Sequence, residues 1–234
     1  MLRAAVRKFV DEKVSTIVKD IPRQEEMVTR LLDFNQICQH ALSNCFVDVD
    51  PASTRLVTNA KFNQAVEEGF RAGFLRRQNK PAEMIAKYLD KTMRKGQKGA
   101  TDVVFHGLLD AALALYRFTN DKDVFRTFYH HRLAKRILTD RSASNDIEQE
   151  MLKKLKNDYD AEFSVGEDMF KDLALSRDMM LEWHATLPAD DPAQKLNVRI
   201  LQQSVWPFSP EQNSFSLPVK VCGVCLAGKM TNVL

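Results

Sequence analysis

The sequence predicts a mainly α-helical protein, and two observations carry that prediction. Apolar residues recur at spacings of three and four along most of the chain, which is the period of one helix face. The 234 residues include only 8 glycines and 8 prolines, and several of these lie between the periodic segments. Long helices joined by short connections are therefore favoured over a β-sandwich or barrel, and 44% apolar residues are enough to build buried cores.

Two amphipathic helices are predicted at the start of the chain. The first spans Met1 to Asp20 and ends near Pro22, because a proline disfavours helical backbone in the residue before it. It begins without an evident cap, which suggests a fragment of a longer protein, although a natural start at Met1 is also compatible with the sequence. The second spans Glu25 to Phe46 and is ended by the polar turn from Asp48 to Pro51.

Three further helices are predicted before residue 121. The first runs from about Ser53 to Arg77 and carries an apolar ridge at spacing four that must pack on another helix, formed by Phe62, Val66, Phe70 and Phe74. The next begins at Asn79 with Pro81 in its first turn, where a missing N–H costs nothing, and ends at a polar break from Lys95 to Gly99. A largely buried helix then runs from Thr101 to about Asn120.

Three helices are predicted in the central stretch, Asp121 to Met180. The first has one apolar face, formed by Phe125, Tyr129, Leu133 and Ile137, and one basic face. Ser144 is a suitable N-cap for the second. Ser164 and Glu167 have the spacing of a capping box for the third, which continues to about Ala185. Beyond a linker, alternating apolar residues predict a strand from Asn197 to Val205, with Trp206 as a core anchor.

The central stretch also carries a family resemblance. KDVFRTFYHHRLAKRIL (122–138), RSASNDIEQEMLKKLK (141–156) and MFKDLALSRDMM (169–180) are similar, in order and spacing, to the start of the cullin homology region. Cullins are the scaffolds of multisubunit ubiquitin ligases. The similarity extends from about Glu25 to Pro218, and within the family we expect the branch that contains cullin-four proteins.

The resemblance implies three parts. Residues 1–118 would be the last cullin-type helical repeat of a stalk, residues 119–190 the helical bundle of the cullin homology region, and residues 191–234 a linker with the first strand of a truncated α/β domain. After Pro218 the sequence departs from the family pattern. We therefore expect a truncated or misread gene product without the strands that pair with a RING protein or the acceptor region for a ubiquitin-like modifier.

The function implied by the resemblance is that of a non-catalytic scaffold subunit, or a fragment of one, in a cullin-RING ubiquitin ligase. It would serve ubiquitin-dependent protein degradation in the cytoplasm and nucleus by holding substrate near activated ubiquitin. The expected partners are a RING protein, through an incomplete site, a ubiquitin-conjugating enzyme and the cullin exchange factor. A substrate-receptor adaptor is expected only in a full-length form.

A basic surface is the candidate partner-binding site. Its residues are Arg126, His130, Arg132, Lys135, Arg136, Lys153, Lys154 and Lys156. By composition alone this is also what a solvated helix face looks like. The resemblance implies a basic groove that attracts the acidic tail of a ubiquitin-conjugating enzyme.

The alternative from a different class is a non-catalytic helical interaction module that binds acidic partners or nucleic acid through its basic helix. The near balance of 34 basic and 31 acidic residues argues against nucleic acid. No run approaches the ~18 apolar residues that a membrane span needs, so no membrane partner is expected.

No catalytic, cofactor or metal site is predicted. Cys222 and Cys225 have C-x-x-C spacing but lack a second pair, and four cysteines in all favour reduced thiols over a disulfide framework. The adjacent His130 and His131 point about 100° apart on a helix and cannot chelate one ion together. Carboxylate pairs such as Asp190 and Asp191 lack an apolar pocket that would shift their pKa.

Overall fold

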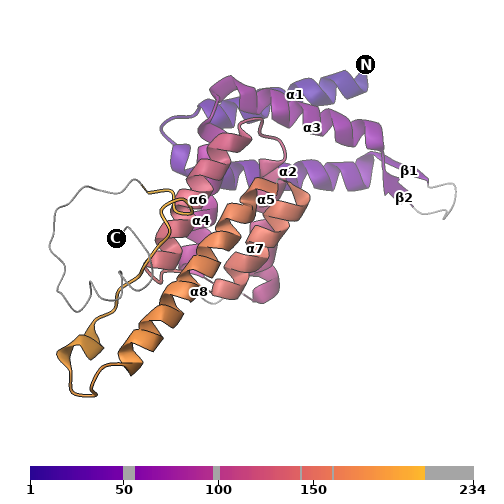
Figure 1. The fold of residues 1–234 in the computed structure, drawn as a ribbon. Helices are drawn as coiled ribbons and strands as arrows, with labels where there is room; N and C mark the ends of the chain where they lie inside the picture. The colour runs from indigo at the N-terminus through magenta and orange to yellow at the C-terminus, as the bar shows by residue number, and fades with distance from the viewer. Residues whose placement is uncertain (50–55, 97–100, 143, 160, 209–234) are drawn as a thin grey trace. The chain divides into compact units, whose positions relative to one another are not determined.

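The computed structural model describes residues 1–49, 56–96, 101–142, 144–159 and 161–208 (Figure 1). This part of the chain is mainly helical, as predicted. Its α-helices are α1 (Leu2–Lys19), α2 (Met27–Cys45), α3 (Ala60–Phe74), α4 (Lys80–Lys95), α5 (Asp102–Tyr116), α6 (Lys122–Leu138), α7 (Asn145–Asp158) and α8 (Ser164–Ala185). Short 3-10 turns span Gln24–Glu26, Leu75–Arg77, Ala161–Phe163 and Pro192–Lys195.

Packing divides the chain into two units, Met1–Tyr129 and His130–Leu234, and the division falls inside α6. Each unit is described by itself. The three-part division into residues 1–118, 119–190 and 191–234 remains a prediction from the family pattern.

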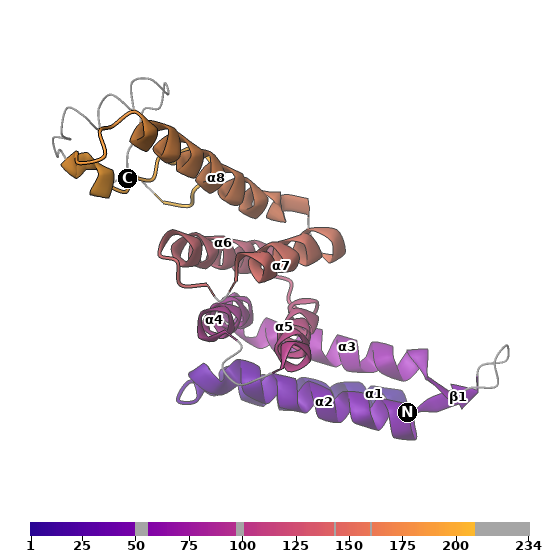
Figure 2. The same ribbon diagram turned by 90° about the horizontal axis from the view of Figure 1, so that it is seen from below.

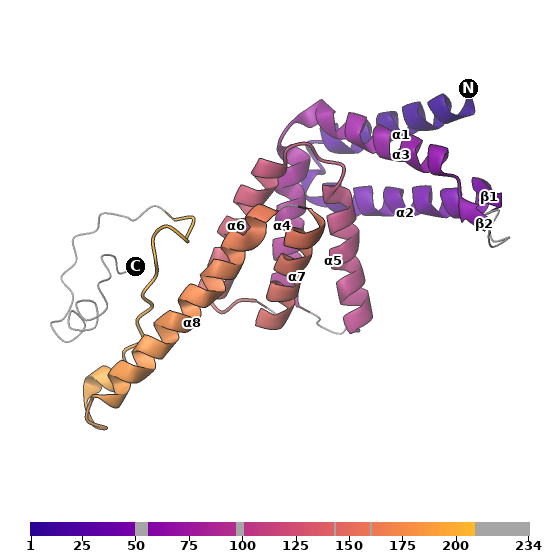
Figure 3. The same ribbon diagram turned by 45° about the vertical axis from the view of Figure 1, so that its right-hand side comes forward.

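In the first unit, α1 and α3 lie side by side over their length (Figures 1 and 3). Two glycines of α3 permit this approach. A Cβ atom on Gly69 would lie 2.7 Å from Val10 Cβ, and one on Gly73 would lie 2.5 Å from Val14 Cγ1. Real Cβ atoms are not found so close to other carbons, so the two helix backbones are nearer than any side chain at these positions would allow.

The aromatic ridge of α3 packs as expected on other helices of the same unit. Phe70 is fully buried and stacks on Phe118, with ring centroids 4.8 Å apart. The ring of Phe34, from α2, also contacts Phe70, with a centroid distance of 5.7 Å. Phe74 is also buried and meets Phe118 edge-on. Stacked phenylalanine rings therefore form part of the otherwise largely aliphatic core of the first unit.

A β-hairpin precedes α3, where the sequence predicted a helix from Ser53. Strands β1 (Val47–Val49) and β2 (Leu56–Thr58) pair antiparallel, with Val47 opposite Thr58. The predicted helix start was wrong for residues 56–59, and residues 53–55 lie outside the described part. α3 begins at Ala60 because the Asn59 side chain accepts the N–H groups of Lys61 and Phe62, at 3.0 and 3.2 Å.

Helices α4 and α5 complete the first unit and cross the layer of α1, α2 and α3 (Figures 1 and 2). Asn79 has a left-handed φ of 64°, and its N–H donates to Asp121 Oδ2 at 2.8 Å. Pro81 then lies in the first turn of α4, as predicted. Thr101 caps α5 by accepting the N–H of Val104.

In the second unit, α7 and α8 pack on the later part of α6. The predicted N-cap is confirmed, because Ser144 Oγ accepts the N–H of Asp146 at 3.1 Å. The predicted capping box at Ser164 and Glu167 was wrong. Phe163, at the end of a 3-10 turn, occupies the N-cap position of α8 without a side-chain hydrogen bond, and Glu167 binds Lys156 Nζ of α7 at 2.8 Å instead.

The predicted strand from Asn197 to Val205 is not formed, and the segment shows only a single bridge residue at Ile200. Side chains of α8 take the place of a neighbouring strand. Ser176 Oγ accepts the N–H of Ile200 at 2.7 Å, and Asp172 Oδ2 accepts the N–H of Gln202 at 2.9 Å. The alternating pattern therefore marks an extended segment whose backbone donors are satisfied by a helix.

Candidate functional site

A buried ion pair joins α6 to α7. Arg136 and Glu148 are both completely inaccessible to solvent. Their groups meet in a two-point contact, with Arg136 Nε 2.7 Å from Oε1 and Nη2 2.9 Å from Oε2 of Glu148. Ser142 Oγ also donates to Oε1, at 2.7 Å. Either charge would be very costly to bury without the other. The pair therefore fixes α7 in one position along α6.

Arg136 was predicted on the exposed basic face, and that placement was wrong. The spacing of Tyr129, Leu133 and Ile137 correctly marks the apolar side of α6, and all three are buried. However, α7 covers the adjacent stripe of the helix as well. Arg136 lies on that stripe and is neutralised by a carboxylate from α7, so no partner can reach it in the folded protein.

His130 was also predicted on that face, and it is buried too, with 8% of its surface exposed. Its ring meets Phe163 edge-on, with ring centroids 5.5 Å apart. His130 therefore belongs to the packing of the second unit rather than to its surface.

The other six predicted residues differ in what they can offer a partner. Lys135 and Lys153 are exposed, and the described residues contain no ion-pair partner for either. Arg132 and Lys154 are half-buried. Lys156 is engaged by Glu167, while Arg126 falls in the first unit and binds Asp123 at 2.5 Å. The predicted basic site therefore offers a partner fewer accessible charges than the sequence suggested.

A second cluster ties the segment after residue 196 to the helices of its own unit. The Trp206 indole Nε1–H donates to Asp172 Oδ2 at 2.6 Å, and Trp206 is 5% exposed, which confirms it as a core anchor. Arg199 donates to the carbonyl of Leu138 at 2.6 Å and to that of Ile137 at 3.2 Å. These carbonyls end α6 and have no helical partner, so Arg199 caps the helix from a distant part of the sequence.

The comparisons with known proteins agree with this arrangement of helices. The family model described as the cullin alpha solenoid domain matches residues 1–180.

The chain belongs to the cullin family.

Among curated cullins, human Cullin-4A is 39% identical over 196 residues, which cover 82% of this chain and 24% of the human protein. Arabidopsis thaliana Cullin-3A is 31% identical over 201 residues, and Dictyostelium discoideum Cullin-4 is 28% identical over 211 residues. The chain spans about a quarter of the length of these relatives: 24% of human Cullin-4A, 26% of Arabidopsis Cullin-3A and 25% of Dictyostelium Cullin-4. The identity to Cullin-4A exceeds that to Cullin-3A, in the direction that the sequence motifs suggested.

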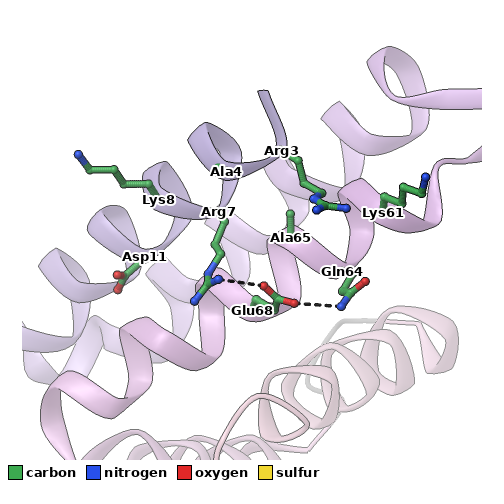
Figure 4. A pocket seen from close by; sticks show the side chains of 9 residues that line it. All are labelled: Arg3, Ala4, Arg7, Lys8, Asp11, Lys61, Gln64, Ala65 and Glu68. Carbon is green, nitrogen blue, oxygen red and sulfur yellow. Dashed lines mark hydrogen bonds and ion pairs between the residues drawn. The ribbon is translucent and has the colours of Figure 1, made fainter. Parts of the chain in front are cut away.

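The first unit of this cullin chain has a polar groove between α1 and α3, shown in Figure 4. Its volume is about 420 Å³, and it is lined mainly by charged side chains, among them Arg3, Arg7, Lys61 and Glu68. Arg7 pairs with Glu68 at 3.3 Å, and the Glu68 carboxylate also accepts from Gln64 at 3.0 Å. The groove contains no grouping of acid, base and nucleophile that would indicate catalysis.

The described residues of this cullin chain contain no group of three or more His, Cys, Asp or Glu side chains that could hold a metal ion. Cys222 and Cys225 lie outside the described residues. Cys38 and Cys45 are free thiols, and burial raises the pKa of the Cys38 thiol to about 11, which makes it a poor nucleophile. None of the helices that the structure describes is both long enough and apolar enough to cross a membrane.

Proposed function

We propose that this chain is a segment of the scaffold of a cullin-RING ubiquitin ligase, without catalytic residues of its own. The observation that carries the proposal is the match of residues 1–180 to the cullin alpha solenoid, together with closely packed helices in each unit. A scaffold of this kind accelerates ubiquitin transfer by holding reactants at a fixed distance. Its contribution is effective concentration rather than chemistry.

Stiffness within each unit supports this role. In the first unit the contact between α1 and α3 leaves no space for a side chain at Gly69 or Gly73. In the second unit the two-point contact of Arg136 with Glu148 fixes α7 against α6, and Trp206 fixes the later segment to α8. Such contacts resist sliding and rotation of one helix against another.

The partners that follow from this proposal are a RING protein, a ubiquitin-conjugating enzyme and the cullin exchange factor. A substrate-receptor adaptor would bind only a longer form. We place the activity in ubiquitin-dependent degradation, in the cytoplasm and nucleus. The exposed basic residues Lys135 and Lys153 are proposed to attract an acidic segment of the conjugating enzyme, mainly by raising the association rate.

Affinity capture from cell extract tests this proposal. Capture on the tagged chain, read by mass spectrometry, is expected to recover a ubiquitin-conjugating enzyme or the exchange factor. Recovery should fall as salt rises, because contacts between exposed charges are screened over about 10 Å at 0.1 M ionic strength. A double variant, Lys135→Gln with Lys153→Gln, is expected to recover the conjugating enzyme several-fold less well.

Lys171→Gln is the matched control, since Lys171 is an exposed lysine of the same unit that is already paired with Asp168. It should leave recovery unchanged. Equal loss in the double variant and the control would contradict the assignment of Lys135 and Lys153. Recovery of none of the three partners by a folded chain would contradict the scaffold proposal itself.

The alternative, a helical module that binds nucleic acid through its basic helix, is not favoured. That alternative depends on the predicted basic surface, and two residues of that surface, His130 and Arg136, are buried within the second unit. The family match gives it no support either.

A further inference from the structure

A second groove of the first unit combines an apolar floor with a basic rim. It lies between α2, α4 and α5 and has a volume of about 280 Å³. Met84 and Tyr88 of α4 and Phe105 and Leu108 of α5 form the floor. We call it the α4 groove. All of its lining residues belong to the first unit.

The apolar floor continues outward onto the surface. Leu108 is 40% exposed, and Val104, one helical turn earlier on α5, is 53% exposed. Tyr88, which also lines the groove, is half-buried, and burial raises the pKa of its hydroxyl group. The groove therefore exposes apolar surface to water, which is unfavourable and would be relieved by binding an apolar side chain.

Three lysines follow one edge of the groove. Lys87, Lys91 and Lys95 are spaced four residues apart on α4, so they lie on one face of the helix. Lys87 is engaged by Glu83 at 2.6 Å. Lys91 and Lys95 are exposed, and no ion pair is described for either within the part of the chain that the structure covers. The acidic residue of the lining is Glu25, which is itself exposed.

We propose that the α4 groove binds an acidic peptide segment that inserts a bulky apolar side chain. The floor would take the apolar side chain, and Lys91 and Lys95 would pair with carboxylates beside it. This site is separate from the basic residues of α6 and α7 and extends beyond the scaffold role, because it adds a peptide-binding surface to the helical repeat.

Size and chemistry favour a peptide over other ligands. Small-molecule and cofactor sites usually occupy roughly 300–1,000 Å³, so a groove of about 280 Å³ accommodates an anchoring side chain better than a whole cofactor. Single-stranded nucleic acid binds through exposed aromatic rings on which bases stack. Phe105 is only 2% exposed and Tyr88 is half-buried, so the groove does not present two open aromatic rings on which successive bases could stack.

The test uses the full chain and a short fluorescein-labelled synthetic peptide with one tryptophan between aspartates and glutamates. Fluorescence anisotropy is expected to show saturable binding that weakens with salt. Two control peptides define the chemistry, one with the tryptophan replaced by alanine and one with the acids replaced by their amides. Each control peptide is expected to bind at least about tenfold more weakly.

Protein variants locate the site. The double variant Lys91→Gln and Lys95→Gln, and separately Leu108→Ser, are expected to weaken binding about tenfold each. The matched control is Lys8→Gln with Lys61→Gln, which removes two exposed lysines from the groove between α1 and α3. It should bind as the unaltered chain does. Circular dichroism of every variant checks that the helices remain folded.

Three outcomes would overturn the proposal. One is the absence of saturable binding to the acidic peptide by the folded chain. Another is loss of binding in the Lys8 and Lys61 control but not in the Lys91 and Lys95 variant, which would move the site to the other groove. The third is tighter binding of an oligouridine RNA than of the peptide, with the same dependence on Lys91 and Lys95, which would assign the groove to nucleic acid.

Discussion

Replacing Gly73 by valine is expected to destabilise the first unit by about 3 kcal/mol or more, the upper end of the cost of overpacking a core. A Cβ atom at this position would lie 2.5 Å from Val14 Cγ1 and 3.2 Å from the backbone nitrogen of Ser15. Rotation of the valine side chain cannot relieve this overlap, because the Cβ position is fixed by the backbone, so α1 and α3 must move apart. Urea unfolding followed by far-UV circular dichroism measures the effect.

Gly107→Ala is the control for this experiment. Gly107 lies within α5, and a Cβ atom there would meet nothing within 4 Å. Alanine should therefore stabilise the helix by about 0.5–1 kcal/mol through its higher helix propensity. Hydrogen exchange of α1 and α3 should accelerate in the Gly73 variant and remain unchanged in the Gly107 variant. Unaltered stability after Gly73→Val would show that the two helices are not in close contact.

Breaking the buried ion pair is expected to have the second large effect. Arg136→Met or Glu148→Gln should each cost about 3–5 kcal/mol, because each leaves a buried charged partner without its counter-charge. Both tryptophans of the chain, Trp183 and Trp206, lie in the second unit, so tryptophan fluorescence during urea unfolding reports on this unit. The midpoint of that transition should fall in both variants.

Two further variants separate the pair from general damage. The double variant Arg136→Met with Glu148→Leu should recover much of the lost stability, since an apolar pair of similar volume can replace a buried ion pair. Lys171→Met removes an exposed pair with Asp168 in the same unit, where both side chains are at least half-exposed, and should leave the unfolding midpoint nearly unchanged. A double variant no more stable than the single variants would contradict the role assigned to the pair.

The helices could be predicted from the sequence because their evidence is local. The spacing of Phe70 and Phe74 identified a buried helix face, and Ser144 identified a helix start, without knowledge of any partner helix. Such periodic and capping signals depend on residues within one or two helical turns.

The candidate site could be predicted only in part, because its residues depend on contacts between elements. Nothing near Arg136 in the sequence shows that α7 will cover it and supply Glu148. The segment around Ile200 has the apolar residues of a strand, but Ser176 and Asp172 of α8 satisfy its N–H groups. Arg136 was assigned to the surface, and the segment around Ile200 to a strand, from the local sequence alone. In both cases a helix distant in the sequence determines the structure.

The glycines of α3 illustrate the same limit. A helix containing Gly69 and Gly73 is weakened in isolation, and their value appears only when Val10 and Val14 of α1 are placed against them. The exposed groove beside Lys91 and Lys95 likewise requires Leu108 of α5 to complete its floor.

The scaffold proposal is tested most directly by exchanging the aligned segment of human Cullin-4A for this chain's residues and measuring ubiquitin transfer in a reconstituted ligase. If the chain is a scaffold segment, the exchanged protein should still accelerate transfer to a bound substrate, to within about tenfold of the parent, because geometry rather than reactive side chains is conserved. A folded exchange protein that binds the same partners as the parent but no longer accelerates transfer would contradict the proposal.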